Sequence, residues 1–268
     1  MKNKWKPLDI IIMAVAVCVL AVSLVKLAGI FLEYKAGTDE YSALSEQFAV
    51  HETAQDKGQE ERGQAVPAEL EEGYFPQLQV DFEALKSLNN DLRAWIYIPA
   101  LEVEYPVVQG SDNDYYLTHT FEKKENKAGA VFMDSEASPQ LTDYNTIIYG
   151  HNMKNGSMFG KLKNFVRDDA LCEGNPYFYL FTEEKNYKYL IISYYVTVDG
   201  GKTYFCPADA DGHSEYLSLI LKNSIFKSGI DYAKDAPIVT LSTCYGASGG
   251  DQRFVVHGVL VETEAAVK

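Results

Sequence analysis

The sequence predicts a mainly β domain, built as a closed barrel or a sandwich and carried behind an N-terminal membrane helix. Tyrosine and phenylalanine are frequent, with 19 and 13 copies in 268 residues, and they favour strands. Short runs rich in Tyr, Val, Ile and Thr recur from residue 74 onward, with Gly, Pro and Asn between them. Many short strands separated by turns are typical of a barrel or a sandwich.

The N-terminal segment has the length and composition of a membrane anchor. Three lysines in the first six residues precede an apolar run over residues 8–32, in which only Asp9 and Lys26 are charged. About 20 apolar residues span a bilayer as a helix, and a lysine near one end can snorkel. The lysines place the N-terminus in the cytoplasm. We therefore expect residues 1–33 to form a cytoplasmic tip and a single-pass signal anchor.

Two other uses of this segment are less favoured. A cleaved signal peptide is the main alternative, but the run is long for one and no convincing small-x-small cleavage site follows it. A lipoprotein site at Cys18 is disfavoured because Val17 is bulky where a small residue is expected.

Residues 34–74 have a different composition. They are rich in Glu, Gln, Ala and Gly, their acids outnumber their bases, and only scattered apolar residues such as Leu44, Phe48 and Leu70 could be buried. Such segments stay solvated, and their charge is repelled by an anionic surface. We expect an acidic extracellular stalk here, followed by the globular domain over residues 75–268.

The globular part is expected to contain few helices. Apolar residues at helical spacing predict a short amphipathic helix over residues 81–89. Two further helices are expected over residues 158–166 and 214–223, the second with Ser214 as its N-cap. The expected strands are residues 94–98, 105–108, 130–133, 146–149, 177–181, 187–198, 203–206, 238–241 and 253–261.

Charge and cysteine usage exclude some functions. The net charge of −14 argues against nucleic acid, which needs a basic face. The four cysteines form no C-x-x-C pair, and no H-x-x-x-H or calcium loop is present, so no metal site or cofactor is expected. A disulfide between Cys172 and Cys206 stays open, since the sequence does not give its geometry.

Cys244 lies where a strand meets a flexible loop. It ends the apolar run from Ile238, and a glycine-rich segment over residues 245–250 follows. Catalytic side chains favour such positions, because the strand aims them and the loop leaves them accessible. By itself, the position also fits a buried strand cysteine.

His151 and Arg253 occupy similar positions. His151 follows the strand predicted over residues 146–149, and Arg253 starts the last strand, nine residues after Cys244. If the glycine-rich segment joins two adjacent antiparallel strands, Arg253 lies beside Cys244. An imidazole can move the proton in acyl transfer, and a guanidinium can stabilise the oxyanion. His257, inside the last strand, is the first rival for the role of His151.

The motifs together resemble those of a known family. The run TLSTC at residues 240–244, followed by Arg253, resembles the signature of the sortases. The resemblance covers about residues 80–262 and is to class B members in particular. It rests there on the segments WIYIP at 95–99, YPVVQ at 105–109, TIIYGHNM at 146–153 and GSMFG at 156–160.

The resemblance implies a fold and a site. The fold would be a closed sortase-type β-barrel of about eight strands, with an N-terminal helix and a helix before the strand that ends in the cysteine. Cys244, His151 and Arg253 match the family's catalytic positions. Ser242 matches a position that lines the substrate groove. Tyr245 stands where many class B members carry an acidic residue; we expect it to contact the substrate and its N–H to serve an oxyanion hole.

The resemblance also implies a reaction. Sortases cleave a C-terminal sorting signal after its threonine, form a thioacyl enzyme, and transfer the acyl group to an amine of peptidoglycan or to a pilin lysine. The chain would then be a membrane-anchored cysteine transpeptidase acting on surface proteins. Two alternatives remain at this point: an exported cysteine protease that hydrolyses envelope peptides, and a non-catalytic cell-wall scaffold.

Overall fold

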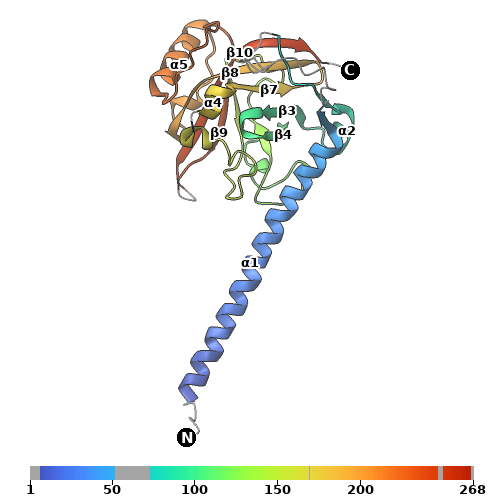
Figure 1. Cartoon of the computed structure of the whole chain (residues 1–268), viewed down its shortest axis with the longest axis vertical. Helices are drawn as coiled ribbons and strands as arrows, with labels where there is room; N and C mark the ends of the chain where they lie inside the picture. The colour runs from blue at the N-terminus through green and yellow to red at the C-terminus, as the bar shows by residue number, and fades with distance from the viewer. Residues whose placement is uncertain (1–6, 52–72, 169, 247–249, 267–268) are drawn as a thin grey trace, which may run out of the picture.

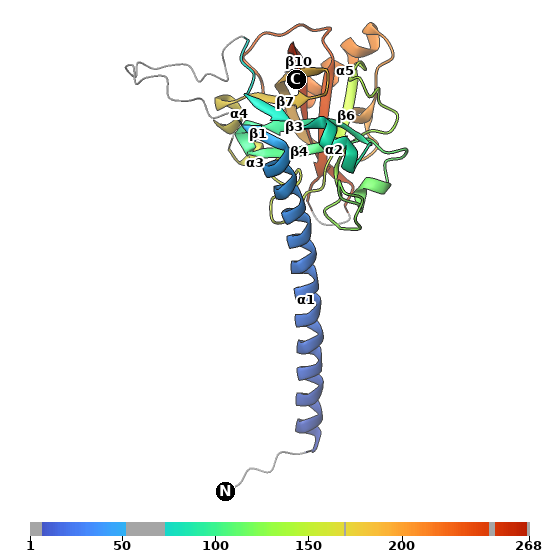
Figure 2. The same cartoon turned by 90° about the vertical axis from the view of Figure 1, so that its right-hand side faces the viewer.

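A long helix projects from a compact β domain (Figures 1 and 2). The computed structural model describes residues 7–51, 73–168, 170–246 and 250–266. The helix α1 (Pro7–Phe48) has 42 residues, which at 1.5 Å per residue is about 60 Å. Within the described residues it is long and apolar enough to cross a membrane, with a mean hydropathy of 2.7 over its most apolar 18-residue stretch, and its large apolar side chains from Ile11 to Leu32 are exposed.

The domain is the closed barrel that the sequence and the resemblance predict. Eight strands follow one another around it in the order β10-β8-β7-β3-β4-β5-β6-β9. The pairs β4–β5 and β6–β9 are parallel and the others are antiparallel. The strands are β3 (Leu92–Ile98), β4 (Val103–Val108), β5 (Val131–Met133), β6 (Asn145–Tyr149), β7 (Tyr177–Phe181), β8 (Lys185–Val198), β9 (Ile238–Cys244) and β10 (Gln252–Ala265).

Helices and short helical turns lie in the connections between the strands. The helix expected over residues 81–89 is α2 (Phe82–Leu88). The others are η2 (Pro99–Leu101), η3 (Tyr115–Leu117), α3 (Asn164–Arg167), α4 (Ala170–Gly174), η4 (Lys202–Tyr204) and α5 (Ala210–Asn223), which precedes the cysteine strand as expected.

Three local predictions are wrong. Residues 203–206 form a turn of η4 and extended chain rather than a strand, because the Thr203 hydroxyl is buried against Tyr195. The helix expected over 158–166 starts only at Asn164, and Met158 has a φ of +54°, which lies outside the right-handed helical region. Helix α5 begins earlier than expected, and Asp209 rather than Ser214 caps it by accepting from the Gly212 N–H at 2.8 Å.

The described part of the expected stalk does not stand free of the domain. The last turns of α1 pack on the barrel, and β1 (Ala49–His51) pairs with β2 (Leu78–Val80). Tyr41 and Leu44 are 6% and 2% exposed. The acidic composition of the segment does not predict this contact, because a few apolar residues at helical spacing are enough to form one docking face. Residues 52–72 of the expected stalk lie outside the described residues.

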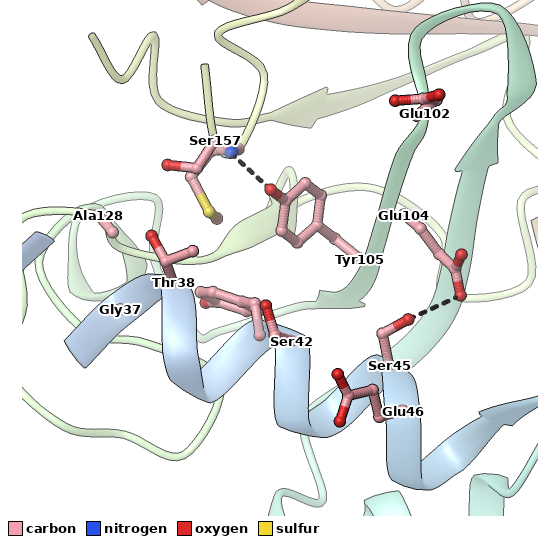
Figure 3. Close-up of a pocket in the computed structure, with 12 residues that line it drawn as sticks. Gly37, Thr38, Ser42, Ser45, Glu46, Glu102, Glu104, Tyr105, Ala128 and Ser157 are labelled. Carbon is pink, nitrogen blue, oxygen red and sulfur yellow. Dashed lines mark hydrogen bonds between the residues drawn. The ribbon is translucent and has the colours of Figure 1, made fainter. Parts of the chain in front are cut away.

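Helix α1 meets the barrel across a small cavity of about 310 Å³ (Figure 3). Its walls combine polar and apolar side chains, and Ser45 of α1 donates from Oγ to Glu104 Oε1 of β4 at 3.3 Å. Elsewhere the four cysteines are all free, so Cys172, which is buried, and Cys206, which is exposed, do not form a disulfide.

Candidate active site

Strand register brings the three predicted residues to one end of the barrel. In the parallel pair of β6 and β9, Tyr149 lies opposite Ser242. His151 and Cys244 each follow two residues later, so both lie at the same end of the two strands. In the antiparallel pair of β9 and β10, Arg253 lies directly opposite Cys244. The site therefore gathers one side chain from the end of each of three adjacent strands.

Cys244 is exposed at the end of a buried strand. The six residues of β9 before it are buried, and Cys244 itself is open to solvent. Its carbonyl accepts from Asn152 Nδ2 at 2.8 Å, and Asn152 Oδ1 accepts from Lys163 Nζ at 2.7 Å. The loop that carries His151 thus also braces the backbone of the cysteine.

The tautomer of His151 follows from its partner. Nε2 lies 2.7 Å from the carbonyl oxygen of Leu117. A carbonyl only accepts, so Nε2 carries a proton and the neutral ring has its lone pair on Nδ1. Such a ring can accept and release a proton at Nδ1.

Three hydrogen bonds from the guanidinium of Arg253 hold its side chain in place. Nη1 donates to the carbonyls of Gly250 at 3.0 Å and of Gln252 at 3.1 Å, and Nη2 donates to Asp199 Oδ2 at 2.7 Å. A guanidinium has five N–H donors. Within the described residues, two of them are left for a substrate carbonyl or an oxyanion.

Ser242 lies beneath a network of tyrosines. It is 2% exposed. Its hydroxyl lies 2.8 Å from the Tyr204 hydroxyl, whose ring stacks on Tyr149. Burial raises the pKa of Tyr204 to about 12, against the opposing effect of the hydrogen bond to Ser242. Tyr204 therefore stays neutral and can both donate and accept at this edge.

One expected contribution of Tyr245 is wrong. Its N–H donates to the carbonyl of Gln252 at 2.9 Å, which continues the β9–β10 ladder. The N–H is therefore engaged and does not point at a vacant oxyanion position. The half-buried side chain packs against Phe254, with ring centroids 6.0 Å apart. Contact between Tyr245 and substrate stays a prediction.

The rival histidine has no access to substrate. His257 is 0% exposed, and its Nδ1 lies 2.9 Å from Thr240 Oγ1. Burial lowers the pKa of His257 to about 3. It is a neutral core residue below the site.

Sequence reasoning missed the residues that hold the predicted ones in place. Leu117, Asn152 and Asp199 contact His151, Cys244 and Arg253 respectively. Asn152 is a neighbour of His151 in the chain and could have been suspected. Leu117 and Asp199 are 34 and 54 residues from their partners, and no local pattern marks a backbone carbonyl or a loop carboxylate as a partner.

Comparisons with known proteins agree with this fold. A family model described as the sortase domain matches residues 96–261. The chain is 36% identical to sortase B of Listeria monocytogenes over 181 residues, which is 66% of this chain and 72% of that protein. It is 28% identical to sortase B of Staphylococcus aureus over 185 residues, which is 68% of this chain and 75% of that protein.

Solved structures are similar as well. Sortase B of Clostridium perfringens has a TM-score of 0.62 and 34% identity, covering 67% of this chain and 99% of that one. Sortase B of Bacillus anthracis, solved in complex with AAEK1, has a TM-score of 0.68 and 28% identity, covering 87% of this chain and 100% of that one.

Proposed function

The chain belongs to the sortase family of cysteine transpeptidases, and on this premise we propose that Cys244, His151 and Arg253 carry out its acyl transfer. One observation supports the proposal most directly. Strand register places Arg253 opposite Cys244 and ends the strand of His151 at the same edge. Neither alternative, a hydrolytic protease or a scaffold, is favoured by the family assignment.

In the first half-reaction, the Cys244 thiolate attacks the carbonyl carbon of the threonine in a sorting signal. The C–S bond forms, and the carbonyl electrons move to oxygen. The two N–H groups of Arg253 that are not engaged by described residues stabilise this oxyanion. His151, which enters this step as the imidazolium after taking the Cys244 thiol proton at Nδ1, donates that proton to the leaving amine as the C–N bond breaks. A thioacyl enzyme and the free C-terminal peptide result.

In the second half-reaction, an amine attacks the thioester. The neutral His151 accepts a proton from the amine at Nδ1, the Arg253 donors stabilise the second oxyanion, and the Cys244 thiolate leaves. A new amide bond is formed, and the enzyme returns to its starting state. Nε2 stays bonded to the Leu117 carbonyl throughout, which keeps the same nitrogen facing the chemistry.

Sortase domains act on sorting-signal substrates and on peptidoglycan. For this chain we propose surface proteins as donors, and a peptidoglycan cross-bridge amine or a pilin lysine as acceptor. Ser242 and Tyr245 would contact the sorting peptide beside Cys244. Because Ser242 is 2% exposed and its hydroxyl lies 2.8 Å from that of Tyr204, it would reach the peptide only together with that tyrosine.

We further propose that the protein is a single-pass membrane protein with its N-terminus in the cytoplasm and its catalytic domain outside. Sortases are cell-surface associated, and α1 supplies a helix of sufficient length and hydropathy. The three lysines before it support this orientation. Residues 1–33 would be tip and anchor, and residues 75–268 the catalytic domain.

The test uses the full-length protein in detergent micelles or nanodiscs. It is incubated with Leu-Pro-type and Asn-Pro-type sorting peptides, with and without triglycine or diaminopimelate, and intact masses are recorded. We expect a thioacyl adduct on Cys244 that an amine converts into ligated peptide. Cys244→Ala should give no adduct. An adduct that only water releases, whichever amine is added, would favour the protease, and an unreactive Cys244 would favour the scaffold.

A further inference from the structure

The part of α1 closest to the domain, residues 33–48, presents one face to it. Here α1 is no longer apolar throughout, yet its contacts are specific. Residues three, four and seven apart share one side of a helix. The contacting residues follow that spacing: Glu33, Gly37, Glu40, Tyr41 and Leu44.

The hydrogen bonds of Glu33, Glu40 and Tyr41 on this face go to one loop, residues 117–130, which leads from η3 to β5, while the Tyr41 ring also packs edge-on against Tyr105 of β4. The carbonyl of Glu33 accepts from Asn126 Nδ2 at 2.9 Å. The carboxylate of Glu40 accepts from the Glu122 N–H at 3.1 Å. The membrane helix and the 117–130 loop are therefore joined by bonds to the loop's backbone as well as to its side chains.

Tyr41 makes the central contact. Its hydroxyl donates to the Gly129 carbonyl at 2.7 Å and accepts from the Phe121 N–H at 3.1 Å. Burial raises the pKa of Tyr41, so the hydroxyl stays neutral and can do both. One side chain of the anchor helix thus ties together two distant points of the loop.

Gly129 transmits this contact to His151. It has a φ of +58°, and a Cβ there would lie 2.9 Å from the Leu117 oxygen and 3.1 Å from His151 Cδ2. The Leu117 oxygen is the acceptor of the His151 Nε2 proton. Only the Gly129 residue therefore separates the Tyr41 hydroxyl from the group that sets the orientation and tautomer of His151.

We propose that Tyr41 is a positioning residue, through which the docked anchor helix holds the Leu117 carbonyl and the His151 imidazole in the geometry used for acyl transfer. The proposal rests on the acid and base roles proposed above for His151. It makes the anchor helix a part of the catalytic scaffold in addition to a tether, so that turnover depends on how the domain sits on its own membrane helix.

The experiment compares Tyr41→Phe with wild type as full-length protein in nanodiscs. The ring is kept, while the hydroxyl and both of its bonds are lost. Because small misplacements of catalytic groups are costly, we expect kcat to fall about tenfold with KM within about twofold. The rate at which a small alkylating reagent modifies Cys244 should be unchanged. Nitrogen-15 NMR of the imidazoles should show a smaller share of the Nε2–H tautomer for His151.

Control variants separate positioning from general destabilisation. Tyr194→Phe removes another buried hydroxyl, which donates to the Phe165 carbonyl at 3.2 Å. Neither residue is part of the candidate site, so this variant should leave kcat unchanged. Gly37→Leu would wedge α1 off the loop, since even a Cβ there lies 3.2 Å from Ala128 Cβ. It should reproduce the kinetic signature if Tyr41→Phe fails to fold. Gly29→Leu on the same helix meets nothing within 4 Å and should behave as wild type.

The outcomes distinguish this inference from the proposed function. Wild-type kcat and wild-type tautomer in folded Tyr41→Phe and Gly37→Leu, together with an inactive His151→Ala, would overturn the positioning role and leave the proposed chemistry intact. A His151→Ala variant with near-native turnover would overturn both. Loss of kcat without change in the tautomer would also contradict the relay through Gly129.

Discussion

The two halves of the site are built in different ways. The strand half, Cys244 and Arg253, is set by the backbone ladder of β9 and β10, in which the two residues lie opposite each other. The loop half, His151, lies beyond the end of β6 and is oriented by the carbonyl of Leu117, 34 residues away in the chain. A ladder has many bonds that share one register, whereas a loop depends on a few separate contacts.

This difference predicts two kinds of sensitivity. Changes in the strand half should act directly, by removing a reacting group. Changes in the loop half should act from a distance, because each support of His151 comes from elsewhere in the molecule. The variants below test this contrast, in order of decreasing effect.

Replacing Arg253 by alanine should lower the rate of thioacyl formation about 100- to 1,000-fold, because the oxyanion loses its donors. Asp199→Ala is the matched control. The Arg253–Asp199 pair is partly exposed, with Asp199 at 57%, and such pairs contribute at most about 1 kcal/mol. We expect less than about a fivefold effect. Single-turnover mass spectrometry measures both, and near-native rates for Arg253→Ala would place oxyanion stabilisation elsewhere.

Gly129→Ala should lower kcat by about tenfold or more, since a Cβ would lie 2.5 Å from the Tyr116 oxygen and the loop must shift. The left-handed conformation itself costs about 1–2 kcal/mol for alanine. Gly200→Ala controls for that cost, because Gly200 has a φ of +66° and nothing within 4 Å. In thermal unfolding Gly129→Ala should lose more stability than Gly200→Ala, because it adds a backbone clash to the conformational cost, and equal turnover rates for the two variants would contradict the loop-half account.

Asn152→Ala should lower kcat about threefold to tenfold, corresponding to about 1 kcal/mol for the bond to the Cys244 carbonyl. This side chain joins the two halves, so its loss should loosen both without removing a reacting group. Asn175→Ala, which removes only a local turn bond to the Tyr177 N–H, is the control. An effect as large as that of Arg253→Ala would mean that the halves are not separable.

His257→Gln should make the free energy of unfolding of the domain less dependent on pH, because His257 is buried in the barrel below Cys244 and Arg253. The pKa of His257 is about 3 in the folded chain and 6.5 ordinarily. Between these values only the unfolded chain binds the proton, so the free energy of unfolding falls as pH falls, by up to about 1.4 kcal/mol per unit. Urea unfolding at pH 6 and pH 4 measures the slope. An unchanged slope would show that water reaches His257.

Much of the fold could be predicted because its signals are local. Alternation and turn residues located eight of the nine expected strands, and the exception, residues 203–206, is a turn held by a buried threonine. The candidate site residues were proposed from strand ends and family motifs. Their partners were not, since the Leu117 carbonyl and Asp199 carry no pattern of their own.

Local sequence patterns were enough to predict the apolar N-terminal run, the β class of the domain, the family, and the pairing of Cys244 with Arg253 across one short connection. Each of these depends on residues close together in the chain. Tertiary structure alone decided that the Tyr245 N–H is engaged in the ladder, that His151 points Nε2 at Leu117, and that α1 docks on the loop which supports it. Those contacts join segments far apart in the sequence, and their geometry exists only once the barrel has closed.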